Sequence, residues 1–405
     1  MYIMDTRKIR EFMVREVEDF LRYNTWLTDC ILVPLTDGVA ISDDASLIAG
    51  AAYLKKEFKQ EVSECSLDQA KVGFLASQLC CDFFCHNQGL IPEILWMPFL
   101  SDTAVNVTKC ARVFDHAYFE KNPYFANITI PDKKMGNISL GHGAYEKDEL
   151  LVWNPLRPRI IGHLNYPMPC IGWMKEAVKY PVLFEDGLAW MSITPNEIET
   201  MRQPIDEASG DVLTLGCGLG YYAYMVSEKE NVSSVTIVEN NPAVIDIFRE
   251  YILPQFPHGD KIRIVQADAF EYLRGITDGQ FTYCFADLWA NSADIVPYLK
   301  VRRICDKFVQ TKVSYWIQDG LDIHIQFSIL YRLKAQYDGD GNLLEEVNAL
   351  LKQEAAEDPS SMAAMQLEGD LLMDDILTEA KFKNVADILR YLAPKNLATM
   401  LPEAD

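Results

Sequence analysis

The stretch DVLTLGCGLGYYAYM, residues 211–225, joins an apolar run to a helical pattern through glycines at every second position. Gly216, Gly218 and Gly220 predict a tight turn in which the backbone can approach a ligand without interference from Cβ atoms. A dinucleotide-binding loop requires a third small residue at position 221, where this chain has Tyr221. The turn therefore predicts a ligand-binding loop and disfavours NAD as the ligand.

Strand and helix patterns alternate from this turn to about residue 290. Four apolar runs are hydrophobic enough to be strands buried on both faces, as parallel strands are. They cover residues 211–216, 233–239, 261–268 and 281–289. Helical patterns connect them, which is typical of a doubly wound α/β sheet. In such a sheet the ligand binds beyond the carboxyl ends of the strands, so we expect the binding residues there.

Two carboxylates follow the second and third predicted strands. Glu239 lies 19 residues after Gly220, where a carboxylate can accept hydrogen bonds from two ribose hydroxyls. Asp268 ends the third strand, where an adenine amino group would find an acceptor. With the glycines, these acids predict a nucleoside without phosphates as the ligand. The simpler alternatives are that the glycines serve only packing and that each acid caps the helix after it.

Residues 205–300 resemble the class I S-adenosylmethionine-dependent methyltransferases. The resemblance rests on LGCGLG at 215–220, on the two strand-end acids and on ADLW at 286–289. It implies a Rossmann-like domain with S-adenosylmethionine as the cofactor. The cofactor-binding residues that it implies are Gly216, Cys217, Gly218, Gly220, Glu239, Asn240, Asp268, Ala269 and Asp287.

Asp287 is also the catalytic residue that the resemblance implies. It would lie beside the sulfonium, where it could orient the acceptor or take its proton. Leu288 and Trp289 would add an apolar wall around the transferring group. The alternative for Asp287 is a turn residue at the end of a strand.

Thr214 departs from the pattern of this family, because many members have an acid two residues before the first glycine. Spermidine synthases lack that acid too, and residues 181–201 resemble the segment that covers their active site. Leu219, however, replaces an Asp of their glycine loop, and DLWANSAD at 287–294 does not reproduce their fourth-strand motif. We therefore expect methyl transfer to a small-molecule acceptor that the sequence does not identify. Aminopropyl transfer and a non-catalytic nucleoside-binding scaffold are the alternatives.

The rest of the chain predicts a layout of four parts. These are a helical N-terminal domain (1–125), a β-rich connector with a hairpin and a helix (126–200), the Rossmann-like domain (201–330) and an acidic helical C-terminal region (331–405). The N-terminal helices are indicated by the apolar spacing of residues 9–21 and by the capping pair Ser66 and Gln69.

A hairpin and a capped helix are predicted directly before the glycine loop. Asp186 and Gly187 lie between two apolar runs, which predicts a tight hairpin turn. The T-P-x-E pattern at 194–197 predicts the start of a helix. We expect this segment to cover the cofactor with Trp190 and Met191, since a methyl-transfer site gains from excluding water. The alternative is a hairpin that only joins domains.

Charge and cysteine content narrow the class of function. A formal net charge of −22 works against a phosphate-binding surface, so nucleic acid is not an expected partner. No apolar run is long enough to span a bilayer, so we expect a cytoplasmic protein without a membrane partner. The ten cysteines lack the spacing of a disulfide framework. No metal site is expected, because Cys80, Cys81, Cys85 and His86 fall on one predicted helix without a second ligand pair.

Overall fold

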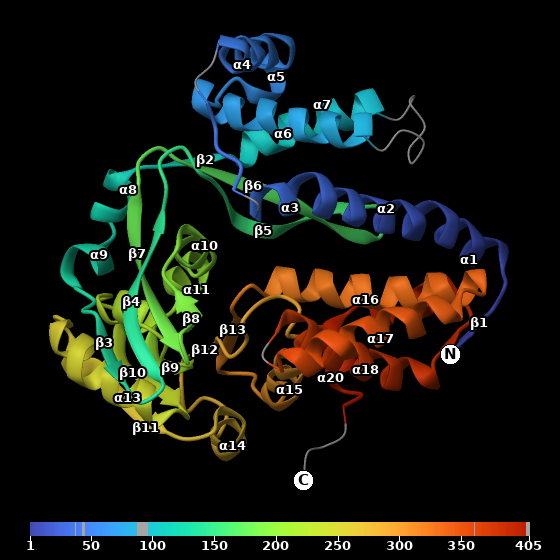
Figure 1. Ribbon diagram of the computed structural model, residues 1–405. Helices are drawn as coiled ribbons and strands as arrows, with labels where there is room; N and C mark the ends of the chain where they lie inside the picture. Colours follow the sequence, from blue (N-terminus) through green and yellow to red (C-terminus); the bar gives the residue numbers. More distant parts are fainter. Residues whose placement is uncertain (37, 43–44, 87–95, 360, 402–405) are drawn as a thin grey trace.

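The computed structural model describes residues 1–36, 38–42, 45–86, 96–359 and 361–401. Figure 1 shows helices of the N-terminal region in blue and helices of the C-terminal region in orange and red, on opposite sides of a ribbon formed by β5 and β6. A parallel sheet with its own helices lies at the lower left of the same view. The molecule is therefore a mixed α/β protein.

The N-terminal region begins with one helical run from Arg7 to Thr36. Ile9, Met13 and Val17 on this run are fully buried, which confirms the buried face expected from the apolar spacing. π-helical turns at Met13–Val17 and Thr28–Leu32 divide the run into α1 (Arg7–Phe12), α2 (Glu18–Leu27) and α3 (Val33–Thr36). The helices that follow are α4 (Ala45–Glu57), α5 (Lys59–Val62), α6 (Leu67–His86), α7 (Trp96–Cys110), α8 (His116–Glu120) and α9 (Pro123–Asn127).

The start of α6 is the reciprocal cap that the sequence predicts. The backbone N–H of Ser66 donates to Gln69 Oε1 at 2.8 Å, and the N–H of Gln69 donates to Ser66 Oγ at 3.1 Å. Further along α6, Cys80 is buried, while the side chains of Cys85 and His86 lie outside the described ones. Among the residues that the structure describes, no three His, Cys, Asp or Glu side chains are grouped to hold a metal ion.

Two smaller sheets follow the helices. One has the strand order β2-β6-β5, and the other has the order β3-β4-β7-β8. Their strands are β2 (Arg112–Phe114), β3 (Lys133–Met135), β4 (Ile138–Tyr145), β5 (Leu150–Ile161), β6 (Leu164–Met174), β7 (Val178–Glu185) and β8 (Leu188–Ser192). β2 falls in the region expected to be helical, because a three-residue strand is too short to show a period in the sequence.

The hairpin that precedes the glycine loop is formed by β7 and β8. The two strands pair antiparallel, and Asp186 and Gly187 between them have φ of 51° and 85°, which confirms the predicted tight turn. α10 (Pro195–Thr200) then begins with the predicted capping box of Thr194 and Glu197. α11 (Arg202–Glu207) leads into the parallel sheet.

The parallel sheet has the order β11-β10-β9-β12-β13, and all its neighbouring pairs run parallel. This confirms the predicted α/β sheet. The chain moves outward from β9 to β11 and then returns to β12 on the other side of β9, so the strand order reverses between β9 and β12. A crevice for a ligand is expected at this point.

The first four strands of this unit alternate with helices as predicted, whereas β13 is not predicted from the sequence. The strands are β9 (Gly210–Leu215), β10 (Val232–Glu239), β11 (Ile262–Gln266), β12 (Tyr283–Ala286) and β13 (Lys312–Tyr315). The helices are α12 (Tyr221–Ser227), α13 (Pro242–Ile247), α14 (Ala269–Gly275) and α15 (Ile295–Cys305). A π-helical turn (Phe248–Ile252) and two 3-10 turns (Leu253–Gln255 and Gly259–Lys261) separate α13 from β11.

The C-terminal region packs on the N-terminal one. It consists of α16 (Gln318–Asp338), α17 (Gly341–Glu357), α18 (Met362–Thr378), β14 (Lys381–Phe382), α19 (Val385–Tyr391) and α20 (Pro394–Ala398). β1 (Tyr2–Ile3) pairs parallel with β14, and α16 contacts α2 and the β5–β6 ribbon. Arg332 ties α16 to α18, because its Nε donates to Asp374 Oδ1 at 2.6 Å.

Within the described residues, no helix combines the length and the apolarity that crossing a membrane requires.

Candidate functional site

A cavity of about 460 Å³, called here the strand-end cavity, lies at the carboxyl ends of β9, β10 and β12. Its wall contains all but one of the predicted cofactor residues, namely Gly216, Cys217, Gly218, Glu239, Asn240, Asp268, Ala269 and Asp287. Gly220 is the exception. It begins α12, and a Cβ atom there would lie 2.4 Å from a ring carbon of Phe248, so Gly220 serves packing.

The other two glycines are required by close contacts of the loop. Gly216 has a φ of 97°, and a Cβ atom on it would lie 2.5 Å from the backbone oxygen of Asp287. Gly218 has a φ of 47°, and a Cβ atom on it would overlap Sδ of Met191 at 1.9 Å. The glycine loop is thus held between the end of β12 and the β7–β8 hairpin.

Glu239 holds the glycine loop from the end of β10. Its Oε2 accepts a hydrogen bond from the Cys217 N–H at 3.0 Å, and its Oε1 accepts one from the Asn241 N–H at 2.9 Å. The cap of α13 is not Glu239 but Asn241, whose side chain accepts from the Ala243 N–H at 3.0 Å. The capping alternative for Glu239 is therefore wrong.

Asp268 does cap the helix that follows it. Its Oδ1 accepts a hydrogen bond from the Glu271 N–H at 2.9 Å at the start of α14. The capping alternative is correct for this residue, yet Asp268 also lines the strand-end cavity. One carboxylate can serve both purposes, because it has about four lone-pair sites.

Asp287 and Glu197 face the strand-end cavity from opposite elements, the end of β12 and the first turn of α10. Burial, together with the nearby charge of Glu197, raises the pKa of Asp287 to about 8. Burial also raises the pKa of Glu197, whose carboxylate accepts the Thr194 N–H at 3.0 Å. The sequence predicts Glu197 only as a capping residue. Nothing in the capping pattern indicates which capping glutamates also face a cavity.

The charged side chains of this wall are all acidic. They are Glu197, Glu239, Asp268 and Asp287, and among the described residues no Lys or Arg lines the cavity. Thr214, which stands where many methyltransferases have an acid, is 2% exposed and also contributes to the wall. The strand-end cavity therefore favours a ligand with positive charge.

The hairpin contributes apolar side chains to the wall of the strand-end cavity. Met191 lies against the glycine loop, where its Sδ accepts the Leu219 N–H at 3.0 Å. Trp190 also lines the cavity and is 54% exposed. Leu288 and Trp289 belong to the same wall, and the Trp289 indole donates to the backbone oxygen of Trp316 at 3.0 Å.

A larger cavity of about 610 Å³ lies on the other side of α12, and no strand contributes to its wall. Several of its polar side chains are already paired. Asn122 Nδ2 donates to the Tyr221 hydroxyl at 2.9 Å, and Arg202 donates to Glu199 at 2.8 Å. The residues predicted to bind the cofactor do not reach it, so the strand-end cavity is the candidate functional site.

Comparison with known proteins gives a partial likeness. No protein-family model matches the sequence, and no curated protein matches it. Among solved structures, spermidine synthase from Thermotoga maritima is similar with a TM-score of 0.27 and 17% identity, over 37% of this chain and 58% of that one. A probable spermidine synthase from Corynebacterium glutamicum has a TM-score of 0.26 and 18% identity, over 32% of this chain and 52% of that one.

A methyltransferase from Podospora anserina, solved with SAH bound, is similar with a TM-score of 0.24 and 22% identity. The match covers 29% of this chain and 48% of that one. The chain thus spans about half the length of these enzymes, and at such scores the likeness says nothing of function.

Proposed function

We propose that the chain binds S-adenosylmethionine in the strand-end cavity and transfers its methyl group to a small acceptor. The observation that carries this proposal is that the glycine loop and the acids Glu239, Asp268 and Asp287 line one cavity at the point where the strand order reverses. A cavity with four acids and no cation in its described wall also suits a sulfonium donor, which brings positive charge.

Glu239 and Asp268 would hold the nucleoside part. The two backbone N–H groups on Glu239 use about half of the lone-pair sites of its carboxylate, which leaves the others for two ribose hydroxyls. Asp268 gives one oxygen to the cap of α14, and the other oxygen can accept from the adenine amino group. The loop glycines allow the backbone to lie close to the ligand.

The remaining residues would serve the transfer itself. The bound donor supplies an activated methyl group and its own leaving group. The chain has to align the acceptor in line with the methyl carbon and the sulfur. Asp287 would take the proton of the acceptor, and Trp190 and Met191 would exclude water from the cavity.

Aminopropyl transfer from the decarboxylated donor is the second candidate, and one observation favours it. Full S-adenosylmethionine carries a carboxylate, and in the described wall of the strand-end cavity no Lys or Arg is present to receive it. The decarboxylated donor lacks that group. Methyl transfer remains the first candidate, because Leu219 is fully buried and supplies no acid for the free amine of the decarboxylated donor.

The choice of donor can be tested by product analysis. The protein is incubated with full or decarboxylated S-adenosylmethionine, each with a panel of amines, carboxylic acids and phenols, and the nucleoside released is identified by mass spectrometry. We expect S-adenosylhomocysteine from the full donor. Methylthioadenosine formed only from the decarboxylated donor and a polyamine would replace methyl transfer by aminopropyl transfer. Binding of either donor without any product would favour the scaffold alternative.

Ligand binding is expected to change the fluorescence of Trp190. This indole lines the strand-end cavity and is 54% exposed, so a nucleoside bound there would shield it from water. Titration with S-adenosylhomocysteine should therefore shift the tryptophan emission of the wild type, and most of this shift should be absent in Trp190→Phe. An equal shift in both proteins would mean that the hairpin only joins domains.

A further inference from the structure

A second cavity, of about 580 Å³ and called here the side cavity, adjoins the strand-end cavity. Glu197, Ala290 and Trp316 line both cavities, so the two meet along these residues. The remaining wall of the side cavity comes chiefly from α10, α11, β13 and the start of α16. The side cavity thus offers room for a second molecule beside a donor.

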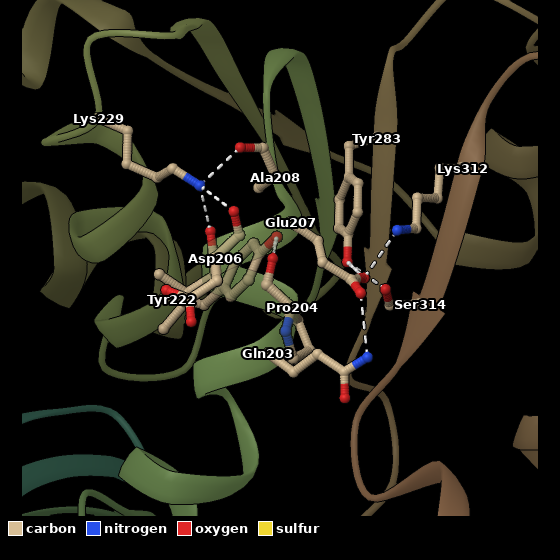
Figure 2. Close-up of polar contacts among 11 residues, drawn as sticks. Gln203, Pro204, Asp206, Glu207, Ala208, Tyr222, Lys229, Tyr283, Lys312 and Ser314 are labelled. Carbon is tan, nitrogen blue, oxygen red and sulfur yellow. Dashed lines mark hydrogen bonds and ion pairs between the residues drawn. The ribbon is translucent and has the colours of Figure 1, made fainter.

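The charges on two sides of the side cavity are neutralised by the protein itself. Figure 2 shows that Glu207 of α11 is enclosed by donors. Gln203 Nε2 donates to its Oε1 at 3.0 Å, and Lys312 Nζ and the Tyr283 hydroxyl lie 3.0 and 3.4 Å from its Oε2. Lys312 is the only Lys or Arg in the described wall of this cavity, and Glu207 already pairs with it.

The negative charge of Glu199 in α10 is neutralised in the same way. Its carboxylate forms ion pairs with Arg112 and Arg202 and accepts a hydrogen bond from the Tyr118 hydroxyl at 2.8 Å. The Glu199 side chain is only 2% exposed, and these three partners compensate its burial. Neither Glu199 nor Glu207 is therefore available to a ligand.

Glu197 lies at the junction of the two cavities, whereas Asp287 lines the strand-end cavity beside it. The Glu197 carboxylate accepts hydrogen bonds from the N–H and the hydroxyl of Thr194, yet burial still raises its pKa. In the described part of the chain, no Lys or Arg pairs with either carboxylate, and no group donates a hydrogen bond to the carboxylate of Asp287. The proximity of the two acids raises the pKa of Asp287, after burial itself. Two carboxylates that repel each other in a desolvated site are the arrangement that a bound cation would stabilise.

Two further groups in the wall of the side cavity lack partners. Asp319, in the first turn of α16, forms no ion pair within the described residues, and burial raises its pKa. The amide oxygen of Asn196 is buried and accepts no hydrogen bond. An anionic acceptor would meet these acids with no free cation to receive it, whereas a donor of N–H groups would satisfy them.

We propose that the acceptor is an alkyl amine whose nitrogen lies between the carboxylates of Glu197 and Asp287 and whose carbon body occupies the side cavity. This proposal rests on the group transfer proposed above. Glu197 becomes the residue that selects a cationic acceptor, and Asp287 the residue that removes the proton. The contribution of Glu197 is independent of its capping role, because the cap requires only an acceptor oxygen and not the charge.

The transfer balances in atoms and electrons. The ammonium group of the acceptor first gives one proton to Asp287 and becomes a neutral amine. The lone pair of its nitrogen then forms a bond to the methyl carbon, while the carbon–sulfur bond breaks and its electron pair stays on sulfur. The products are a methylated ammonium group and a neutral thioether, and the proton on Asp287 leaves to water.

The first experiment compares three probes of equal length. 1-Aminohexane, hexan-1-ol and hexanoate are titrated at pH 7 into the wild-type protein saturated with S-adenosylhomocysteine, and saturation-transfer NMR gives their affinities. We expect the amine to bind about tenfold more tightly than either other probe, as for a hydrogen bond to a charged group. An amine that binds no more tightly than hexanoate would overturn the proposal.

Three variants locate the probe. Glu197→Gln keeps an acceptor oxygen for the cap and should remove most of the preference for the amine. Ser292→Phe places a ring in the side cavity and should weaken the amine and hexan-1-ol alike. Glu185→Gln, on the hairpin outside both cavities, is the control and should change neither. An undiminished preference in a folded Glu197→Gln protein would contradict the assignment.

The same measurements distinguish a failure of the amine proposal from a failure of the proposed methyl transfer. Affinity for S-adenosylhomocysteine is measured in the same samples, and the amine preference is also measured without it. Nucleoside binding without an amine preference would leave the proposed function standing and reject the amine. An amine preference without nucleoside binding would reject the proposed function and keep a cation site at Glu197 and Asp287.

Discussion

Glu239→Ala is expected to weaken the binding of S-adenosylhomocysteine at least about 30-fold, or about 2 kcal/mol. The wild type should bind with micromolar affinity. The variant loses the carboxylate that we assign to the ribose hydroxyls. It also frees the N–H groups of Cys217 and Asn241, which lie 3.0 and 2.9 Å from the Glu239 oxygens and fix the glycine loop. Isothermal titration calorimetry on both proteins measures the difference.

Glu239→Gln separates the two effects of this substitution. Its amide oxygen can still accept one backbone N–H, so the loop should be held better than in the alanine variant, while the bidentate contact to the ribose is lost. Thermal unfolding without ligand reports on the loop, and calorimetry reports on the nucleoside. If all three proteins bind S-adenosylhomocysteine equally well, Glu239 does not contact the ligand.

Asp287→Asn is expected to be more stable than the wild type at pH 8.5 and to lose transfer activity. Burial raises the pKa of Asp287 from its ordinary 3.8 to about 8 in the folded protein. The folded state thus keeps a proton that the unfolded chain has released. The stability of the wild type should therefore fall as pH rises from about 4 to about 8, and asparagine, which does not titrate, removes this loss. A gain on the order of 3 kcal/mol is expected at pH 8.5.

Urea denaturation of both proteins at pH 5 and pH 8.5 tests the direction of this pH dependence of stability. Below pH 4 both states of the wild type hold the proton, so the advantage of the variant should vanish toward acid pH. Activity should show the opposite dependence, since only the deprotonated carboxylate can accept a proton, and the wild-type rate should rise toward pH 8. An active Asp287→Asn protein would remove Asp287 from the catalytic role.

The features that the sequence predicts correctly are those with a local cause. Three of the four apolar runs predict parallel strands because β9, β10 and β12 are largely buried inside the sheet, whereas β11, from the third run, lies at its edge and is only partly buried. The pair Asp186 and Gly187 predicts the hairpin because both adopt positive φ in its turn. Glu239, Asp268 and Asp287 could be located in advance because the ends of parallel strands meet at one edge of the sheet.

The features that the sequence does not predict depend on contacts between distant segments. Glu197 resembles any capping glutamate, and only the tertiary placement of α10, which contacts β5, brings it into the wall that also contains Asp287. The close approach of Met191 to Gly218 depends on where the hairpin lies, not on its pattern. β1 and β14 have two residues each, too few for a strand signal.

The pairing of β1 with β14 has a consequence for how the chain is made. Tyr2 and Ile3 leave the ribosome long before their partners Lys381 and Phe382, which follow only after the parallel sheet and α16–α18 have been synthesised. The apolar face of α2 packs on both β6 and α16, so it is completely covered only after α16 has been synthesised. Contacts of such long sequence separation close slowly. The parallel sheet can therefore form while the chain is still being made, whereas the two helical regions join only after β14 has been synthesised.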